Sequence, residues 1–231
     1  MPFTPIENIY QRKSDIFWIF CRIGCPIEWG WFAKGLHESY AYKPHSDGSD
    51  AIYQKKDFSW VADFLLENSF LLPRQGKALD LASGLGENAL FLAGQGLESH
   101  AWDISSMALT RLKKKAAQKN LVIAVKHTDI VAAKLPKNEF DVIVVCRFLD
   151  RSLSHAIIDC LKPDGLLFYK TYVKEKIAVD GPGNPDFLLD RNELLNIFNP
   201  LTVVAYRENS RLGDLTCGDR NEAYFIGQKR H

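Results

Sequence analysis

Two acidic residues frame a glycine-rich turn within the stretch KALDLASGLGENALFLAGQG, which begins at Lys77. Asp80 lies in an apolar run just before the turn, and Asp103 ends a second apolar run about twenty residues further on. A turn that opens a helix presents backbone N–H groups to an anion. A carboxylate at Asp80 would repel a pyrophosphate held there. The pattern therefore favours a ligand that has no phosphate and carries positive charge.

S-adenosylmethionine has both properties, because it lacks phosphate and carries an ammonium and a sulfonium group. Asp80 would attract these cations, directly or through a water, while the helix N-terminus holds the methionine carboxylate. The turn GLGENA also fits the G-x-G-x-x-G/A dinucleotide pattern formally, with Asp103 placed to bind a ribose. A nicotinamide-dependent oxidoreductase therefore stays open as an alternative, as does a protein that binds S-adenosylmethionine without catalysis.

The apolar segments that carry these residues alternate with helix-like segments from about residue 77 to residue 172. Short apolar runs separated by helices of this length predict an α/β fold, a doubly wound, mostly parallel sheet covered on both faces. Two late alternating segments indicate a C-terminal antiparallel strand pair. We expect strands at 77–82, 97–103, 122–129, 140–146, 166–172, 201–209 and 222–229.

Other segments are less regular. Ser105 is expected to cap a helix that follows it, and the sequence KPDG at 162–165 is expected to form a turn. We expect helices at 57–70 and 190–198, and an N-terminal cap formed by residues 1–56. The excursion at 173–189 contains GPGNP, which could be a plain surface loop or a lid over the site.

Composition narrows the classes of function. The 231 residues are 46% hydrophobic, enough for one sizeable core with a small appendage. The formal net charge of +1 gives no general attraction to nucleic acid or to an anionic membrane. The five cysteines are odd in number and irregularly spaced, which is typical of reduced thiols in a cytoplasmic protein. Cys21 and Cys25 fit no common zinc pattern, so we expect no metal.

The stretch LDLASGLGENALFLA resembles motif I of the class I S-adenosylmethionine-dependent methyltransferases. The wider chain, from about Trp60 to near the C-terminus, is similar to methyltransferase-domain proteins of the tellurite-resistance type. The segments AWDIS, TDI, FDVIVVCRFLDR, LKPDGLLFYKTY and NPDFLLDRNELL follow in the order found there. The resemblance implies a seven-stranded Rossmann-like domain over residues 57–231. It also implies S-adenosyl-L-methionine as methyl donor and S-adenosyl-L-homocysteine as product.

The resemblance further implies where the donor binds. The turn residues would line the methionine end, Asp103 would accept from the ribose hydroxyls, and Asp129 would accept from the adenine amino group. Ala82 stands where the family usually has its first glycine, and its small side chain keeps backbone approach possible. The implied cofactor-binding residues are Asp80, Ala82, Ser83, Gly84, Gly86, Asn88, Asp103, Ile104, Asp129, Ile130, Cys146 and Arg147.

Methyl transfer from a sulfonium is an in-line displacement in which alignment and exclusion of water matter most, so a dedicated base is optional. We predict that Arg147 orients an anionic or polar acceptor, with Tyr169 or Tyr172 at its border. Lys170 stands where relatives often carry Glu, which bears on the substrate more than on the cofactor. The other candidates near the acceptor are Asp150, Arg151, His155 and Lys170. We expect a small-molecule acceptor, no nucleic acid or membrane partner, and a monomer or homodimer.

Overall fold

The computed structural model of the protein describes residues 60–178 and 181–230. All of them belong to Glu38–His231, the second of the two compact units into which the chain divides. The predicted cap at 1–56, its boundary with the following domain, and Cys21 and Cys25 lie outside the described residues.

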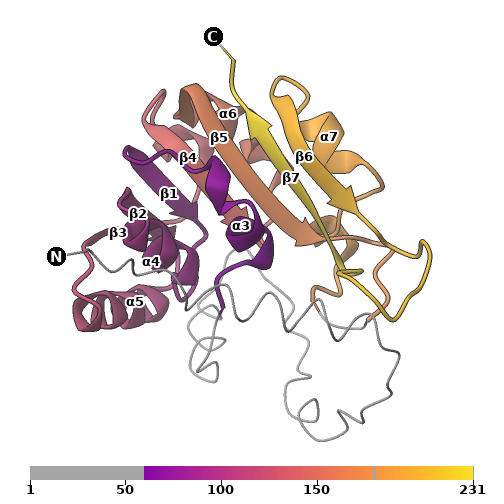
Figure 1. Ribbon diagram of the computed structural model, residues 1–231, viewed down its shortest axis with the longest axis horizontal. Helices are drawn as coiled ribbons and strands as arrows, with labels where there is room; N and C mark the ends of the chain where they lie inside the picture. Colours follow the sequence, from indigo (N-terminus) through magenta and orange to yellow (C-terminus); the bar gives the residue numbers. More distant parts are fainter. Residues whose placement is uncertain (1–59, 179–180, 231) are drawn as a thin grey trace, which may run out of the picture. The chain divides into compact units, whose positions relative to one another are not determined.

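One seven-stranded sheet in the order β3-β2-β1-β4-β5-β7-β6 forms the centre of this unit (Figure 1). Strands β1 to β5 are parallel, whereas β7 is antiparallel to both β5 and β6. The predicted α/β fold with a C-terminal antiparallel pair is therefore confirmed. The strands are β1 (Lys77–Leu81), β2 (Glu98–Asp103), β3 (Ile123–His127), β4 (Phe140–Cys146), β5 (Leu161–Tyr172), β6 (Thr202–Glu208) and β7 (Glu222–Gln228).

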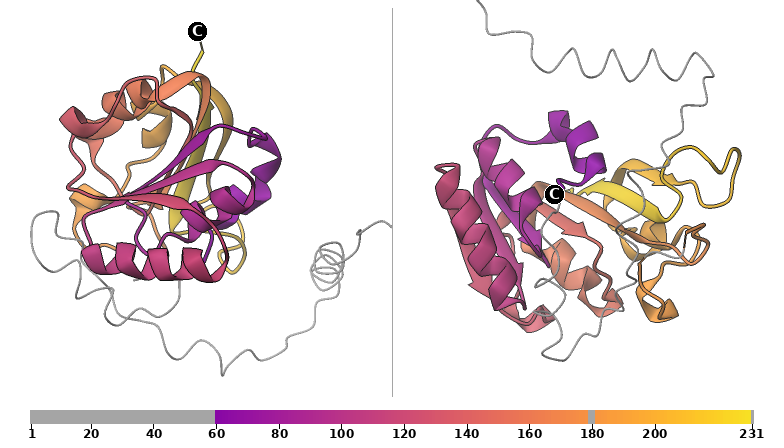
Figure 2. Two further views of the ribbon diagram at one scale, coloured as in Figure 1. Left: turned by 90° about the vertical axis from the view of Figure 1, so that its left-hand side faces the viewer. Right: turned by 90° about the horizontal axis from the view of Figure 1, so that it is seen from below.

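Helices cover both faces of the sheet, as Figures 1 and 2 show. Helices α3, α4 and α5 pack on one face, and α6 and α7 pack on the other. Short 3₁₀ turns η1 (Ser69–Leu71), η2 (Ala132–Lys134), η3 (Arg151–Leu153) and η4 (Pro185–Phe187) complete the described helical structure. The helices are α3 (Asp63–Glu67), α4 (Glu87–Gly94), α5 (Ser106–Gln118), α6 (Ser154–Cys160) and α7 (Glu193–Ile197).

Three expected boundaries differ from the structure. The described part of the helix expected at 57–70 is only α3, because Asn68 ends it by donating its side-chain amide to the Phe64 carbonyl at 2.8 Å. The helix expected at 190–198 is shorter too, since Asn192 has a left-handed φ of 60° directly before α7. The expected KPDG turn lies within β5, where Asp164 has a φ of 63° and the pairing with β4 shifts register.

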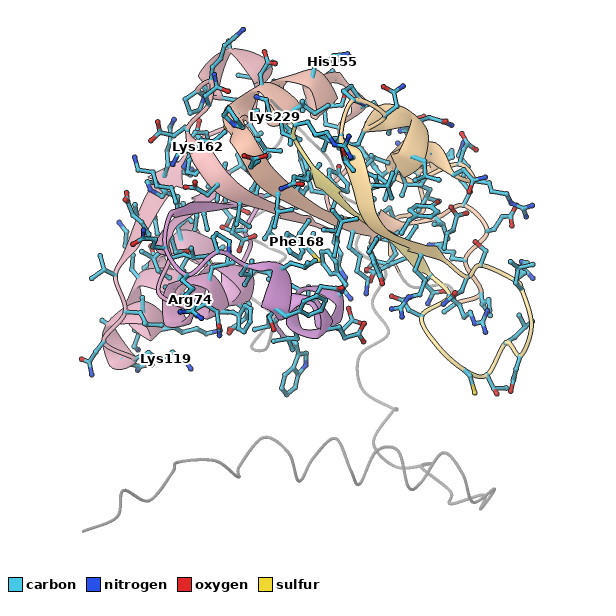
Figure 3. The ribbon with its side chains drawn as sticks, turned by 45° about the horizontal axis from the view of Figure 1, so that its top comes forward. Arg74, Lys119, His155, Lys162, Phe168 and Lys229 are labelled. Atoms are coloured by element: carbon cyan, nitrogen blue, oxygen red, sulfur yellow. The ribbon has the colours of Figure 1, made fainter. Side chains whose placement is uncertain are left out.

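The hydrophobic core lies on both faces of the sheet. Aromatic and aliphatic side chains fill both faces, and Phe168, labelled in Figure 3, packs its ring 6.2 Å from that of Phe64 in α3. Lys162 and Lys229 lie at the upper edge in Figure 3, where β5 begins and β7 ends. The carboxyl ends of β1 and β4 meet at the opposite edge. Strand β1 pairs with both β2 and β4, so the strand order reverses there, which is where open α/β sheets bind ligands.

Candidate active site at the carboxyl ends of the parallel strands

The turn between β1 and α4 has an unusual backbone. Ala82, Gly84 and Gly86 have φ values of 57°, 53° and 74°, in the left-handed region. Ala82 thus adopts the conformation that a glycine would adopt more readily, and its small side chain limits the strain. A Cβ on Gly86 would lie 2.5 Å from Leu112 of α5, so this position requires glycine for close packing. The turn is therefore fixed by its neighbours before a ligand binds.

Asp80 lies in β1 beneath this turn and is 1% exposed. Its Oδ2 accepts from the Ala89 N–H at 3.0 Å, and the Asn88 side chain also bonds to it. Burial raises the pKa of Asp80 to about 8 and outweighs these bonds, while the nearby Asp103 charge adds to the rise. A cation beside this carboxyl would lower the pKa and be attracted, whereas an anion would raise it further. The site therefore suits a positively charged ligand.

Asp103 at the end of β2 is buried and is already hydrogen-bonded to backbone. Its Oδ2 accepts from the Gly84 N–H and its Oδ1 from the Ser105 N–H, both at 2.7 Å. Ser105 in turn caps α5 by accepting from the Ala108 N–H, which confirms the expected cap. Binding of the ribose hydroxyls by Asp103 stays a prediction.

Ser83 has the one buried side-chain polar atom without a hydrogen-bond partner in the part of the chain that the structure describes, its Oγ. Unsatisfied buried hydroxyls are rare because they lose their bonds to water. The Ser83 Oγ lies in the glycine turn itself, two residues after the end of β1. This atom is available to a ligand with hydrogen-bonding groups, which fits the methionine end of the expected donor.

The residues expected around adenine follow β2 and β3. The Thr128 N–H donates to the Asp103 carbonyl at 3.0 Å, which joins the two strand ends. Ile130 packs with Ala82 against the same apolar cluster, and both Ile104 and Ile130 are partly buried. Within residues 60–178 and 181–230, no hydrogen bond engages the Asp129 carboxylate; only its backbone carbonyl accepts. The adenine contacts of Ile104, Asp129 and Ile130 stay predictions.

Cys146 ends β4 at the same edge, and Arg147 follows it directly. Burial, followed by the charge of Glu222, raises the pKa of the Cys146 thiol to about 12, so it stays protonated and is a poor nucleophile. Arg147 has a left-handed φ of 57°, its N–H donates to the Lys170 carbonyl at 2.8 Å, and its Nε donates to Glu222 Oε1 at 2.6 Å. Its side chain is 56% exposed.

The two candidate tyrosines lie on different faces of the sheet. Tyr169 is 2% exposed on the face of α6 and α7, and its hydroxyl donates to the Phe148 carbonyl at 2.8 Å. Tyr172 is partly buried, and its ring centroid lies 5.8 Å from the Arg147 guanidinium carbon. Gly181 packs against the same ring, since a Cβ there would lie 2.6 Å from it. Tyr169 therefore has a structural contact within the core, whereas Tyr172 lies beside Arg147.

A buried ionic cluster beside Arg147 was missed in the sequence. Lys170 is 4% exposed and pairs with Asp63 at 2.6 Å, Asp219 at 2.7 Å and Glu222 at 3.2 Å. A lysine within the apolar run LLFYKTY is the signal for it, because a buried ammonium requires acidic partners. The sequence did not indicate which acids these would be, since they come from α3, from the segment before β7 and from β7 itself.

The other acceptor candidates have structural partners. Asp150 caps η3 by accepting from the Ser152 N–H at 2.9 Å. Arg151 binds both oxygens of Glu193, at 2.5 and 2.9 Å, and donates to two backbone carbonyls. The Ser154 hydroxyl lies 3.5 Å from His155 Nδ1. Asp150 and Arg151 therefore stabilise the segment that follows β4, and Arg151 also bonds it to the backbone at Asp186 and Leu188.

Among residues 60–178 and 181–230, no group of three or more His, Cys, Asp or Glu side chains is placed to hold a metal ion. None of the helices in this part of the chain combines the length and apolar character needed to cross a bilayer.

The strand order and the acidic strand ends define the fold of the class I S-adenosylmethionine-dependent methyltransferases. The chain belongs to the TehB family, because residues 59–225 match the family model described as "Tellurite resistance protein TehB". The resemblance noted in the sequence is thereby confirmed.

Individual relatives agree with this family. The "Probable S-adenosyl-L-methionine-dependent methyltransferase TehB" of Haemophilus influenzae (strain ATCC 51907 / DSM 11121 / KW20 / Rd) is 29% identical over 151 residues, 63% of this chain and 52% of that protein. The chain thus spans about half the length of the curated relatives it matches, 52% of two of them and 47% of the third.

Solved structures share the fold. The crystal structure of TehB from Haemophilus influenzae has a TM-score of 0.63 at 22% identity, covering 79% of this chain and 67% of that one. An S-adenosylmethionine-dependent methyltransferase from Clostridium acetobutylicum ATCC 824 has a TM-score of 0.59 at 14% identity, covering 80% of this chain and 96% of that one.

Proposed function

We propose that this protein transfers a methyl group from S-adenosyl-L-methionine to a small-molecule acceptor. Membership in the TehB family supports the class of reaction. The observation that carries the proposal is Asp80, a carboxyl buried beneath the turn with its pKa raised to about 8, since such a group favours a cationic ligand. The proposal includes a cytoplasmic location and a monomer or homodimer without a nucleic-acid or membrane partner.

When bound, the donor supplies an electrophilic methyl group on a sulfonium, and the thioether formed in its place needs no proton. Asp80 would hold the cationic end, and the Ser83 hydroxyl and the α4 N-terminus would hold the methionine carboxylate. Asp103 would fix the ribose, while Asp129 would accept from the adenine amino group between Ile104 and Ile130. These contacts orient the methyl group toward Cys146 and Arg147.

Arg147 and Tyr172 would bind the acceptor. The half-exposed guanidinium of Arg147 can donate to an anionic or polar group, and the Tyr172 ring lies beside it. Alignment of the acceptor with the methyl group and exclusion of water would supply most of the rate, so no general base is invoked.

The test is a transfer assay with methyl-labelled S-adenosylmethionine. The full chain is incubated with low-molecular-mass fractions of a cell extract and with a panel of thiols, amines, hydroxy acids and tellurite. Tellurite is included because the family model is named for resistance to it. Label should enter a small molecule, and S-adenosylhomocysteine should form in equal amount.

Two results would reverse the proposal. Binding of NADH without binding of S-adenosylmethionine in calorimetric titrations would indicate a nicotinamide-dependent oxidoreductase. Binding of S-adenosylmethionine with no labelled product in any fraction or panel member would indicate a protein that binds the donor without catalysis.

A further inference from the structure

The two arginines that follow β4 are used in opposite ways. The guanidinium of Arg151 is engaged on every side, by both oxygens of Glu193 and by the carbonyls of Asp186 and Leu188. Arg147 makes one side-chain hydrogen bond, from Nε to Glu222. Across residues 60–178 and 181–230, neither terminal nitrogen of Arg147 has a hydrogen-bond partner. Both terminal nitrogens of Arg147 thus lack a hydrogen-bond partner among the described residues, whereas each terminal nitrogen of Arg151 has at least one.

Arg147 is nevertheless held firmly in place. Its N–H donates to the Lys170 carbonyl, and its left-handed φ turns the chain sharply at the end of β4. The 2.6 Å bond from Nε to Glu222 is charge-assisted and fixes the plane of the guanidinium. The two terminal nitrogens lie in the same plane, on the other side of the guanidinium carbon from Nε. The guanidinium group of Arg147 is thus oriented through Nε, while its two terminal nitrogens have no hydrogen-bond partner among the described residues.

Glu222 can do this because its own position is fixed. It is 7% exposed, and its two oxygens serve different cations: Oε1 binds Arg147 and Oε2 lies 3.2 Å from Lys170 Nζ. Burial alone would lower the pKa of Lys170, but Glu222, Asp219 and Asp63 raise it above its ordinary value. Lys170 therefore remains charged, and Glu222 has a permanent partner on each oxygen.

We propose that Glu222 and Lys170 are positioning residues that present the terminal nitrogens of Arg147 to the methyl acceptor. This inference rests on the proposed function and deepens it, since the fork selects an acceptor with an anionic or polar oxygen or sulfur group. Lys170 acts through Glu222, and neither residue contacts the acceptor. Such a buried ion pair contributes little net stability, so orientation of Arg147 is the physical effect expected from it.

The test compares Glu222→Gln with Glu193→Gln in the full chain. Glu222→Gln keeps the size of the side chain and removes the charge that holds Arg147. Glu193→Gln removes the same charge from the matched pair at Arg151. The readouts are the S-adenosylhomocysteine affinity by calorimetry, the half-saturating amount of a labelled low-molecular-mass extract fraction, and the exchange rate of the Arg147 Nε–H by ¹⁵N NMR.

Glu222→Gln should raise the half-saturating amount about tenfold and accelerate Nε–H exchange about tenfold, as loss of a charged hydrogen bond predicts. Its affinity for S-adenosylhomocysteine should stay within about twofold of the wild type, because Asp80, Ser83 and Asp103, which are proposed to hold the donor, are untouched. Glu222→Asp, which restores the charge on a shorter side chain, should bring both the half-saturating amount and the Nε–H exchange rate part of the way back to the wild-type values. Glu193→Gln should change neither of the two Arg147 readouts.

An unchanged half-saturating amount in Glu222→Gln would overturn the inference. A fall in S-adenosylhomocysteine affinity as large as the rise in the half-saturating amount would also overturn it, since the two together would indicate general damage to the fold. If the wild type labels no fraction, the proposed function fails separately. The Nε–H exchange then decides alone, and equally fast exchange in wild type and Glu222→Gln overturns the positioning role.

Discussion

The Asp103 carboxylate accepts the Gly84 N–H at 2.7 Å, so the end of β2 is bonded to the glycine turn that follows β1. Its second oxygen accepts the Ser105 N–H at the same distance. One side chain thus holds both loops of the proposed donor site in register. A ligand that binds across these loops meets a site that is already formed, which lowers the cost of ordering it.

Asp103→Asn should weaken both the turn and the donor site. Asn has one side-chain oxygen in place of two, so one of the two backbone N–H groups loses its acceptor. We expect a loss of about 1–3 kcal/mol in unfolding free energy and at least a tenfold loss in S-adenosylhomocysteine affinity. Urea unfolding and calorimetry measure these. Glu98→Gln, at the opposite end of β2, is the control, and equal effects of the two substitutions would contradict the role of Asp103.

The raised pKa of Asp80 should make the stability of the ligand-free protein depend on pH. Between the ordinary value of 3.8 and about 8, the folded protein keeps a proton that the unfolded chain has released. The unfolding free energy should therefore fall as the pH rises through this window and level off above about 8. Asp80→Asn should lack this part of the slope. Urea unfolding of both proteins at several pH values measures it, and identical slopes would show that Asp80 ionises normally.

Gly86→Ala should destabilise the protein through a backbone and a packing effect. An alanine there would have a φ of 74° and would place its Cβ 2.5 Å from Leu112. We expect a loss of about 1–3 kcal/mol in unfolding free energy, and a double variant with Leu112→Ala should lose less than the sum of the two single losses. Gly94→Ala is the control, since nothing outside its chain neighbours and its own helix backbone lies within 4 Å of its Cβ position. A Gly86→Ala protein as stable as the control would refute the tight contact.

Tyr169→Phe separates a structural from an acceptor-side role. It removes the hydroxyl that donates to the Phe148 carbonyl. We expect a loss of about 1 kcal/mol in unfolding free energy and an unchanged rate of methyl transfer. Tyr172→Leu should instead raise the half-saturating amount of acceptor, because the ring beside Arg147 is lost. A large fall in turnover for Tyr169→Phe at full stability would restore Tyr169 to the acceptor site.

Local patterns in the sequence predict much of the fold and of the proposed donor site. The run FDVIVVC predicts β4 because a strand buried on both faces is apolar throughout. Asp80 and Asp103 could be placed near the turn since each lies at or near the end of a strand adjacent to it. The ends of α3 and α7 could not be predicted from the sequence, because they depend on single residues such as Asn68 and Asn192.

The acceptor side is less visible in the sequence for a physical reason. Glu222 is 75 residues from Arg147 along the chain and reaches it only because β7 runs antiparallel to β5, with Glu222 opposite Tyr172. No local pattern encodes that pairing. Lys170 signals that an acidic partner exists, and only the folded chain identifies Asp63, Asp219 and Glu222 as its partners.

The central claim is that Asp80 attracts a cationic, phosphate-free donor, and the pH dependence of donor affinity tests it most directly. Calorimetric titration with S-adenosylmethionine, from about pH 6 upward, should show affinity rising up to about tenfold per pH unit and levelling near 8, as binding ionises Asp80. Asp80→Asn should bind at least tenfold more weakly near pH 8 and lack this rise. Equal affinity and equal pH dependence in the two proteins would contradict the claim.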